Sequence, residues 1–219
     1  SQVVLSYKAL SNIQLPIPTY AEQKKIIEIL SSVENTIDKL QISIRKLNFL
    51  KNGVSSDLIT GKYHLSSLKD SKFGSIPKGW EVKKLKDCLD EFNCKSTEND
   101  QHEVFTSSSK GLIRQTDYFG ANRITRRDTK GFNIIPNKYL TYRSRSDSNA
   151  FYFNQNDLGK IGLVSKYYPV FKAKDGIELN KFFVFLLNYY SEIISQESVG
   201  TSQVVLSYKA LSNIQLPIP

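Results

Sequence analysis

Hydrophobic residues follow a seven-residue repeat along one early stretch of the chain. From position 26 to position 47 the apolar residues are separated by alternating steps of four and three, with mostly polar or charged residues between them. This spacing is typical of a coiled coil, because it keeps one narrow seam of a helix facing a partner helix. The predicted seam consists of Ile26, Leu30, Val33, Ile37, Leu40, Ile44 and Leu47, followed after a shift in spacing by Val54 and Leu58.

Local signals predict where this helix begins and ends. Thr19 and Glu22 have the spacing of a capping box, and Gly61 is a typical helix terminator. The long helix is therefore expected within residues 19–62, and some forty residues would make it about 60 Å long. No second segment has a comparable period, so we expect the seam to pair antiparallel with a second copy of the chain. The alternative is that the helix packs against its own domain.

An 18-residue sequence occurs twice without a single change, as residues 1–18 and again as residues 202–219. The offset of 201 residues indicates one full period of a longer two-unit pattern plus an overlap. Each copy closes on Leu-Pro-Ile-Pro, and the first copy leads directly into the long helix. In a dimer, the first copy of one chain and the second copy of the other should compete for one place at a helix entrance, so only one can dock there.

The remainder of the chain has a different pattern. Residues 63–76 are polar and punctuated by Gly, and we interpret them as a linker. From Trp80 onward, short apolar runs rich in Tyr and Phe alternate with Gly, Asn, Asp and Ser, which predicts strands. The apolar run from 180 to about 195 is long enough for a buried helix. We therefore predict an α+β chain, with a mixed α/β domain over 77–219 attached to the long helix.

Charge indicates an anionic partner. The chain has a formal net charge of +9 and a pI near 9.4, which favours nucleic acid. Six of its seven arginines lie between positions 114 and 145, and the window 110–147 holds nine basic residues against three acidic ones, a net charge of +6. The candidate DNA-binding residues are Lys110, Arg114, Arg123, Arg126, Arg127, Lys130, Arg143, Arg145 and Asn149.

The residue types in this window suit DNA recognition. The planar fork of arginine pairs with guanine edges or clamps phosphate, and asparagine pairs with adenine, so Arg143, Arg145 and Asn149 are candidates for reading bases. The alternative for each residue is an ordinary solvated basic surface.

Several other functions receive little support. There is no run of 18 apolar residues and no secretion signal, so we expect a cytoplasmic protein without a membrane span. Two cysteines are too few for a disulfide framework or a usual zinc site. Asp70, Glu81 and Lys83 faintly resemble the acidic-plus-lysine pattern of metal-dependent nucleases, but Glu81 and Lys83 more simply begin a strand. We therefore expect no catalytic residues, metal or cofactor.

Several separated motifs, in order, resemble those of the specificity subunit of type I restriction–modification systems. The motifs are Leu15-Pro-Ile-Pro-Thr-Tyr-Ala-Glu-Gln23 with the residues to Leu30, Leu58-Ile-Thr-Gly-Lys62, Ile76-Pro-Lys-Gly-Trp-Glu81 with Lys84-Leu85, Ile161-Gly-Leu-Val-Ser165, and Gly200-Thr-Ser-Gln203 with the closing Leu-Pro-Ile-Pro. The resemblance implies a non-catalytic subunit that binds double-stranded DNA through target recognition domains and assembles with methyltransferase and restriction subunits. In this family two long helices usually form an antiparallel coiled coil that sets the spacing of two half-sites.

This chain differs from that pattern, because it has one recognition domain and one long helix. Two copies joined through antiparallel helices would rebuild the full arrangement and should read two identical half-sites in inverted order. Two alternatives from other classes stay open: a stand-alone metal-dependent nuclease, and a coiled-coil protein-interaction module with an incidental basic surface.

Overall fold

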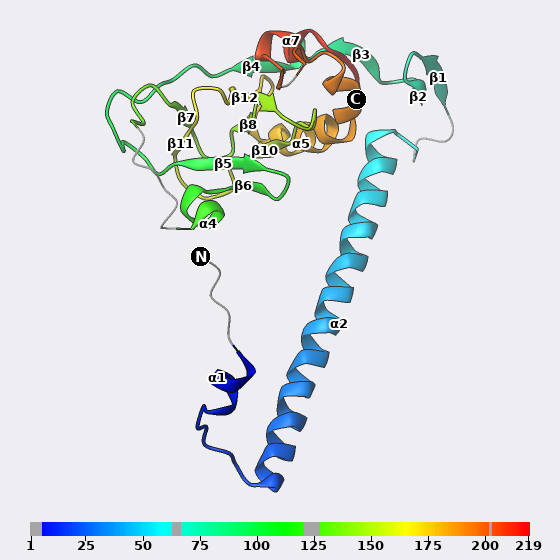
Figure 1. The fold of residues 1–219 in the computed structure, drawn as a ribbon. Coiled ribbons are helices and arrows are strands. Elements are labelled where there is room, and N and C mark those ends of the chain that lie inside the picture. The colour runs from blue at the N-terminus through cyan, green and yellow to red at the C-terminus, as the bar shows by residue number, and fades with distance from the viewer. Residues whose placement is uncertain (1–5, 63–66, 121–127, 202) are drawn as a thin grey trace. The chain divides into compact units, whose positions relative to one another are not determined.

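The computed structural model describes residues 6–62, 67–120, 128–201 and 203–219, and Figure 1 shows their helices and strands. Contacts divide the chain into two units, Ser1–Gly53 and Val54–Pro219. Among the described residues, the first unit contains α1 (Tyr7–Ser11) and most of α2 (Tyr20–Ile59), and the second contains the end of α2 together with the strands and the other helices. The predicted α+β class, with one long helix and a mixed α/β domain, is confirmed.

The long helix α2 begins and ends where local chemistry predicts. The backbone N–H of Thr19 donates to the Glu22 carboxylate at 2.8 Å, and the Glu22 N–H reaches the Thr19 hydroxyl at 3.4 Å, which completes a capping box. The hydrogen bond from the Thr19 hydroxyl lowers the pKa of Glu22. At the other end, Gly61 has a φ of 70°.

The turn after α2 is a Schellman motif. The Gly61 N–H donates to the Leu58 carbonyl at 3.2 Å, and the Lys62 N–H donates to the Asp57 carbonyl at 3.0 Å. A Cβ at position 61 would lie 2.3 Å from the Pro77 ring, so both the backbone angle and the close approach require glycine. Ile59, the last residue of α2, is buried in the core of the second unit.

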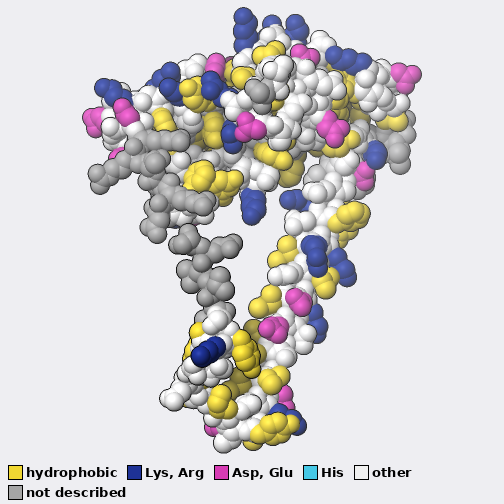
Figure 2. Space-filling model, viewed as in Figure 1, with side chains coloured by type: hydrophobic (Ala, Val, Ile, Leu, Met, Phe, Trp, Pro, Cys, Tyr) yellow, Lys and Arg dark blue, Asp and Glu magenta, His cyan; other side chains and the backbone are white. Residues whose placement is uncertain are grey.

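The seam residues of α2 are exposed in the single chain. Their exposed fractions run from 45% at Ile26 to 65% at Leu47. Figure 2 shows hydrophobic side chains along the length of this helix, interspersed with basic and acidic ones. An exposed apolar stripe of this length is unusual for a soluble monomer, because burial of each such side chain is worth about 1.5–3 kcal/mol.

The second unit is built around a four-stranded antiparallel sheet with the order β10-β8-β12-β4. Five two-stranded pairs surround this sheet: β1-β2, β3-β14, β5-β6, β7-β11 and β9-β13. The strands are β1 (Leu68–Ser71), β2 (Gly74–Pro77), β3 (Glu81–Lys84), β4 (Leu89–Glu91), β5 (Phe105–Ser108), β6 (Gly111–Arg114), β7 (Asn133–Ile135), β8 (Leu140–Tyr142), β9 (Arg145–Ser146), β10 (Phe153–Gln155), β11 (Gly162–Val164), β12 (Val170–Ala173), β13 (Val204–Val205) and β14 (Gln215–Ile218).

Short helices cover this framework: α3 (Leu85–Cys88), α4 (Gln115–Phe119), α5 (Asn180–Tyr189), α6 (Ser191–Ser195) and α7 (Tyr208–Asn213), with a 3-10 turn at Ile177–Leu179. The helix predicted for residues 180–195 is present but divided, because Tyr190, with φ −88° and ψ 18°, interrupts it between α5 and α6. Its inner face is buried, with Leu186, Leu187 and Ile194 fully enclosed.

The segment expected to be a linker contains a β-hairpin in its described part. Within residues 63–76, the strands β1 and β2 form an antiparallel hairpin that turns at Gly74, where φ is 87°. Phe73 packs edge-on against Tyr190 at 5.6 Å, and Ile76 is buried. Among the described residues of the hairpin, Leu68 is exposed and Phe73, Ile76 and Pro77 are shielded, so little apolar sequence marks it and its pattern resembled a polar connector.

Buried side chains form two clusters in the second unit. The larger cluster joins Ile59 of α2 to the sheet, to α5 and to the C-terminal copy of the repeat, and includes the fully buried Tyr142 and Phe171. The smaller cluster lies around Phe105 and Ile135. Because Ile59 belongs to the larger cluster, the end of α2 is part of the same core as the sheet.

The two copies of the repeat have different environments. In the C-terminal copy, β14 pairs with β3 in antiparallel register, and the side chains of Leu206, Leu211 and Leu216 are fully buried. In the N-terminal copy, the equivalent Leu10 and Leu15 are 53% and 68% exposed, and the residues equivalent to β14 form no strand. The C-terminal copy therefore completes the second unit of its own chain.

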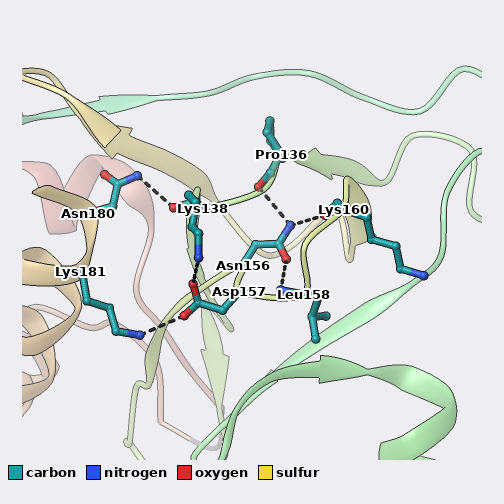
Figure 3. Close-up of polar contacts among 8 residues, drawn as sticks. All are labelled: Pro136, Lys138, Asn156, Asp157, Leu158, Lys160, Asn180 and Lys181. Carbon is teal, nitrogen blue, oxygen red and sulfur yellow. Dashed lines mark hydrogen bonds and ion pairs between the residues drawn. The ribbon is translucent and has the colours of Figure 1, made fainter. Parts of the chain in front are cut away.

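A buried asparagine holds together the connections around β10. The Asn156 side-chain amide donates to the carbonyls of Ile135, Pro136 and Lys160 at 3.2, 3.0 and 2.8 Å, and its oxygen accepts from the Leu158 N–H at 3.2 Å. Figure 3 shows the bonds to Pro136, Leu158 and Lys160 converging on this one side chain. Because Asn156 is fully buried, no water can replace these bonds without opening the fold.

Asn156→Ala should lower the free energy of unfolding by on the order of 3 kcal/mol, because it leaves several buried polar groups without partners. Asn93→Ala is the matched control, since Asn93 is exposed and its substitution should change stability by less than about 0.5 kcal/mol. Urea denaturation followed by fluorescence of Trp80 would measure both. Equal midpoints for the two variants would contradict this account.

Candidate nucleic-acid interface

Two arginines project from one short segment that follows a buried strand. After Tyr142 at the end of β8, exposed or half-exposed Arg143 and Arg145 alternate with buried Ser144 and Ser146. Alternation is the normal property of extended backbone, in which successive side chains point to opposite sides. The local sequence Arg-Ser-Arg-Ser therefore places both guanidinium groups on the same outer face.

The backbone of this segment is tied to the C-terminal copy of the repeat. The Tyr142 hydroxyl donates to the Leu206 carbonyl at 2.9 Å, and the Leu206 N–H donates to the Ser144 carbonyl at 2.9 Å. The Ser144 hydroxyl also donates to the Tyr167 carbonyl. Burial raises the pKa of Tyr142, so its hydroxyl stays a neutral donor throughout the physiological range. The arginine segment is consequently held on a rigid base.

Each arginine has a distinct set of contacts. The Arg145 guanidinium lies over the Tyr167 ring, 3.8 Å from its centroid. The Arg143 Nη2 atom is 3.7 Å from the Asp147 carboxylate, which also accepts a hydrogen bond from the Gln203 amide at 2.9 Å. Stacking uses the flat face of a guanidinium and so leaves its N–H fork for another acceptor. The Arg143–Asp147 pair is well exposed and worth at most about 1 kcal/mol, so a phosphate could displace the carboxylate at little cost.

These arginines lie between two hollows in the surface of the second unit. The larger has a volume of about 1140 Å³ and is lined by Arg143, Arg145 and Tyr167, with further polar groups that include Asn99 and Gln203. The smaller, of about 340 Å³, is lined by the β5–β6 turn, including Lys110, and shares both arginines. The arrangement presents two donor forks beside aromatic and amide groups, which suits contacts to phosphates and to base edges.

The predicted candidates are only partly brought together. Lys110, Arg143 and Arg145 line the hollows, whereas Lys130 and Asn149 do not. The Asn149 side-chain oxygen accepts a hydrogen bond from Ser198 at 3.0 Å, and φ of Asn149 is 55°. The candidates Arg123, Arg126 and Arg127 lie outside the described residues.

Some of the basic residues in this region form ion pairs with acidic residues of the same chain. Arg114 lies 3.5 Å from the Glu103 carboxylate, so it is already paired. Lys138 and Lys181 both hold the Asp157 carboxylate, at 2.8 and 2.9 Å, as Figure 3 shows. Partial burial alone would raise the pKa of Asp157, but the hydrogen bonds and charges of the two lysines outweigh it and lower that pKa. The net charge of the window therefore overstates what is offered to a partner.

Sequence reasoning missed most of the lining of the larger hollow, including two residues that contact the arginines or the adjacent Asp147. Neither Tyr167 nor Gln203 was among the candidates, yet Tyr167 stacks under Arg145 and Gln203 donates to Asp147, next to the arginine segment. The only signals were an aromatic residue near a buried strand and an amide at the start of the second copy. Neither signal indicates a site until the fold acts: pairing of β9 with β13 brings Gln203 near Asp147, and contacts with Ser144 and Arg145 place Tyr167 beside them.

Two of the residues considered for nuclease chemistry, Glu81 and Lys83, pair with each other. The Lys83 ammonium is 3.0 Å from the Glu81 carboxylate, a contact that raises the pKa of Lys83, and Asp70 accepts a hydrogen bond from Ser75 at 3.3 Å. Among the residues that the structure describes, no three His, Cys, Asp or Glu side chains are grouped so that they could hold a metal ion.

Within the same described ranges, no helix combines the length and the apolar character needed to cross a membrane.

Comparisons with solved structures give weak similarity. The crystal structure of the HsdS subunit from Thermoanaerobacter tengcongensis is 16% identical, with a TM-score of 0.41, and the match covers 100% of this chain and 52% of that one. A structure described as the structural basis of complex assembly and conformational transition of the type I R-M system is 15% identical, with a TM-score of 0.46, over 93% of this chain and 48% of that one.

Curated relatives are more informative. The type I restriction enzyme MjaVIII specificity subunit of Methanocaldococcus jannaschii is 28% identical over an alignment of 231 positions, gaps included, that covers 97% of this chain and 53% of that protein. The putative type I restriction enzyme MjaX specificity subunit of the same organism is 26% identical, over 100% of this chain and 52% of that protein. The chain thus spans about half the length of the curated relatives it matches.

The family model described as "Type I restriction modification DNA specificity domain" matches residues 1–48 and 77–219. These two matches include most of α2 and the whole set of strands from β3 to β14. The chain therefore belongs to the type I restriction modification DNA specificity domain family.

Proposed function

We propose that this chain is a DNA sequence-recognition subunit of a type I restriction–modification complex in the cytoplasm, without catalysis of its own. The observation that carries the proposal is the family match over residues 77–219, the region that contains the arginine-lined hollows. In this proposal, the second unit is a target recognition domain that reads one half of a bipartite double-stranded target. Methyltransferase and restriction subunits supply the chemistry.

Arg143 and Arg145 are proposed to read the target, and Lys110 to contact a phosphate. The two arginines have the forked donor geometry that distinguishes guanine in the major groove, and their backbone is held rigidly by Tyr142 and Leu206. Lys110 lies on the exposed turn of the β5–β6 hairpin beside them. A lysine at such a position acts as a point charge and supplies affinity without sequence preference.

The α2 seam is proposed to join two copies of the chain antiparallel. The apolar spacing shifts after Leu47, but if Ile26 is assigned to heptad position d and Lys51 is counted as a polar seam residue, one heptad register extends from Ile26 to Val54 and Leu58. An antiparallel pair centred near Ile42 then opposes every a position to a d position. The opposed pairs are Ile26 with Leu58, Leu30 with Val54, Val33 with Lys51, Ile37 with Leu47, and Leu40 with Ile44.

Such a dimer would carry two identical recognition domains related by a two-fold axis. The expected target is therefore an inverted repeat of one half-site, with its spacer set by the rigid pair of helices. Sequencing of modified bases in cells with and without this chain tests the function directly, since an inverted-repeat motif should lose methylation when the chain is deleted. An unchanged methylation pattern would overturn the proposed function.

Arg145→Lys should relax the preference for one base in each half-site and leave the salt dependence of binding nearly unchanged, because the charge is kept while the fork is lost. Competition binding to a duplex library randomised around the target motif would measure both properties. Arg45→Lys on α2 is the matched control, being an exposed arginine far from the hollows in sequence. Equal loss of preference in both variants would exclude a reading role for Arg145.

Ile37→Asp should dissociate the dimer, because it places a charge in the centre of the seam. Ile42→Asp makes the same change on the same helix, from a side chain of similar exposure, 43% against 47%, but at an outward heptad position. It should leave the dimer intact. Light scattering across a dilution series would distinguish the two, and dissociation of both variants, or of neither, would contradict the assigned seam.

Lys51→Leu should strengthen association by roughly tenfold or more, since a buried leucine replaces the one polar residue of the seam and about 1.4 kcal/mol corresponds to a factor of ten. Sedimentation equilibrium would give the dissociation constants. A weaker or unchanged dimer would show that Lys51 does not face Val33 of the partner and that the register differs from the one proposed.

A further inference from the structure

The identical copies of the repeat adopt the same local helix although only one is packed in a core. In the N-terminal copy, Ser6 caps α1 by accepting from the Ala9 N–H at 3.2 Å. In the C-terminal copy, Ser207 caps α7 by accepting from the Ala210 N–H at 3.1 Å. This part of the repeat is therefore already formed before it meets any partner.

The C-terminal copy occupies a surface that we call the socket, made by β3, α3 and β9. Strand β14 pairs along β3, with Gln215 opposite Lys84 and Leu216 opposite Lys83. The Leu85 N–H at the start of α3 donates to the Ile214 carbonyl at 2.9 Å, and β13 pairs with β9. The socket thus recognises the repeat through backbone hydrogen bonds and through pockets for its leucines.

The N-terminal copy carries the same groups without such a surface. Its Leu10, Ile13, Leu15 and Ile17 are 52–75% exposed, whereas the equivalent residues of the C-terminal copy are at most 8% exposed. Because the two sequences are identical, any socket that fits one copy fits the other with the same side-chain contacts. The occupant suited to the exposed N-terminal copy is therefore the socket of a chain like this one.

The socket of the same chain is out of reach for the N-terminal copy. Only Pro18 and Thr19 separate its strand-equivalent residues from α2, and two residues span about 7 Å. The helix that follows is continuous for 40 residues, about 60 Å. Its last residue, Ile59, is buried in the same core as the leucines of the C-terminal copy that fill the socket. Within residues 1–219, the socket available to the N-terminal copy is therefore that of a second copy of the chain.

We propose that the N-terminal copy of one chain and the C-terminal copy of a second chain are alternative occupants of the second chain's socket. This rests on the proposed function, because antiparallel pairing of α2 brings the start of each helix to the end of its partner. The chain's own C-terminal copy holds the socket in the structure. The N-terminal copy takes its place whenever the C-terminal copy is displaced. Each chain therefore carries a second segment that can complete the recognition domain of its partner.

The exchange can be trapped by cysteines placed at the β3 register. In a chain with Cys88→Ala and Cys94→Ala, the pair Gln14→Cys with Lys84→Cys should form a disulfide between two chains, because position 14 in the socket would stand where Gln215 stands now. The pair Gln215→Cys with Lys84→Cys is the matched control and should oxidise within one chain. Non-reducing gels of the 219-residue chain separate the two products.

Displacing the resident copy should increase the trapped species. Leu216→Asp weakens the C-terminal copy and should raise the yield of the disulfide between chains several-fold over the parent. Adding Leu15→Asp, the same substitution in the same sequence context, should abolish the disulfide in either background. The proposal also predicts exchange in the parent with an intact C-terminal copy, so a Leu15-dependent disulfide there tests the proposal even if Leu216→Asp does not fold.

Two results would overturn the proposal. One is the absence of a disulfide between chains in both backgrounds while the control pair oxidises fully. The other is a disulfide that survives Leu15→Asp, because it would not depend on the repeat. Light scattering separates these from failure of the helix pairing: monomers that still form the Leu15-dependent disulfide would support the exchange and refute the α2 dimer.

Discussion

The pairing of the C-terminal copy with the rest of the second unit is the interaction on which the other features depend. It supplies Leu206, Leu211 and Leu216 to the larger core, and that core also encloses the end of α2 at Ile59. In the same segment, the Leu206 carbonyl accepts a hydrogen bond from the Tyr142 hydroxyl, and the Leu206 N–H donates one to the Ser144 carbonyl. These two bonds fix the backbone that carries the arginines. One closing segment therefore supports both the attachment of the long helix and the geometry of the candidate interface.

This dependence gives the arginine segment a rigidity that its own sequence does not provide. Arg143–Ser146 is short, polar and next to a turn, and such segments are usually mobile unless they are tied down. Here the buried Tyr142 holds one side, and the β9–β13 pair holds the other. Preorganised donors lose little conformational freedom on binding, so the entropic cost of ordering this segment is met during folding and not when a partner binds.

The sequence was sufficient for features that are decided locally. Helix α2 was predicted nearly to the residue, because a capping box and a Schellman glycine define its ends and a heptad repeat defines its length. The aromatic strands and the buried helix after residue 180 also follow from short-range patterns. The β1–β2 hairpin was missed because few apolar side chains support it, and the break at Tyr190 was missed because the apolar run continues through it.

The candidate site was predictable only in part, for a similar reason. Clustered arginines in the sequence pointed to Arg143 and Arg145, but the use of Lys138 by Asp157 and of Arg114 by Glu103 depends on contacts between distant segments. Gln203 reaches Asp147 only because β13 pairs with β9. Composition therefore located the charged region. Which of its basic residues are paired within the protein and which are left for a partner depends on the fold.

The repeat separates local from long-range determinants within this one molecule. Both copies form a capped helix at the same place, so that helix is encoded by its own residues. Only the copy that lies beside β3 forms a strand, so the strand is supplied by its neighbour and not by the sequence Gln-Leu-Pro-Ile. Proline in that strand removes one donor, which confines the segment to an edge where a single partner strand suffices. An edge strand held on one side, with a helix already formed, is the kind of element that can be exchanged between chains.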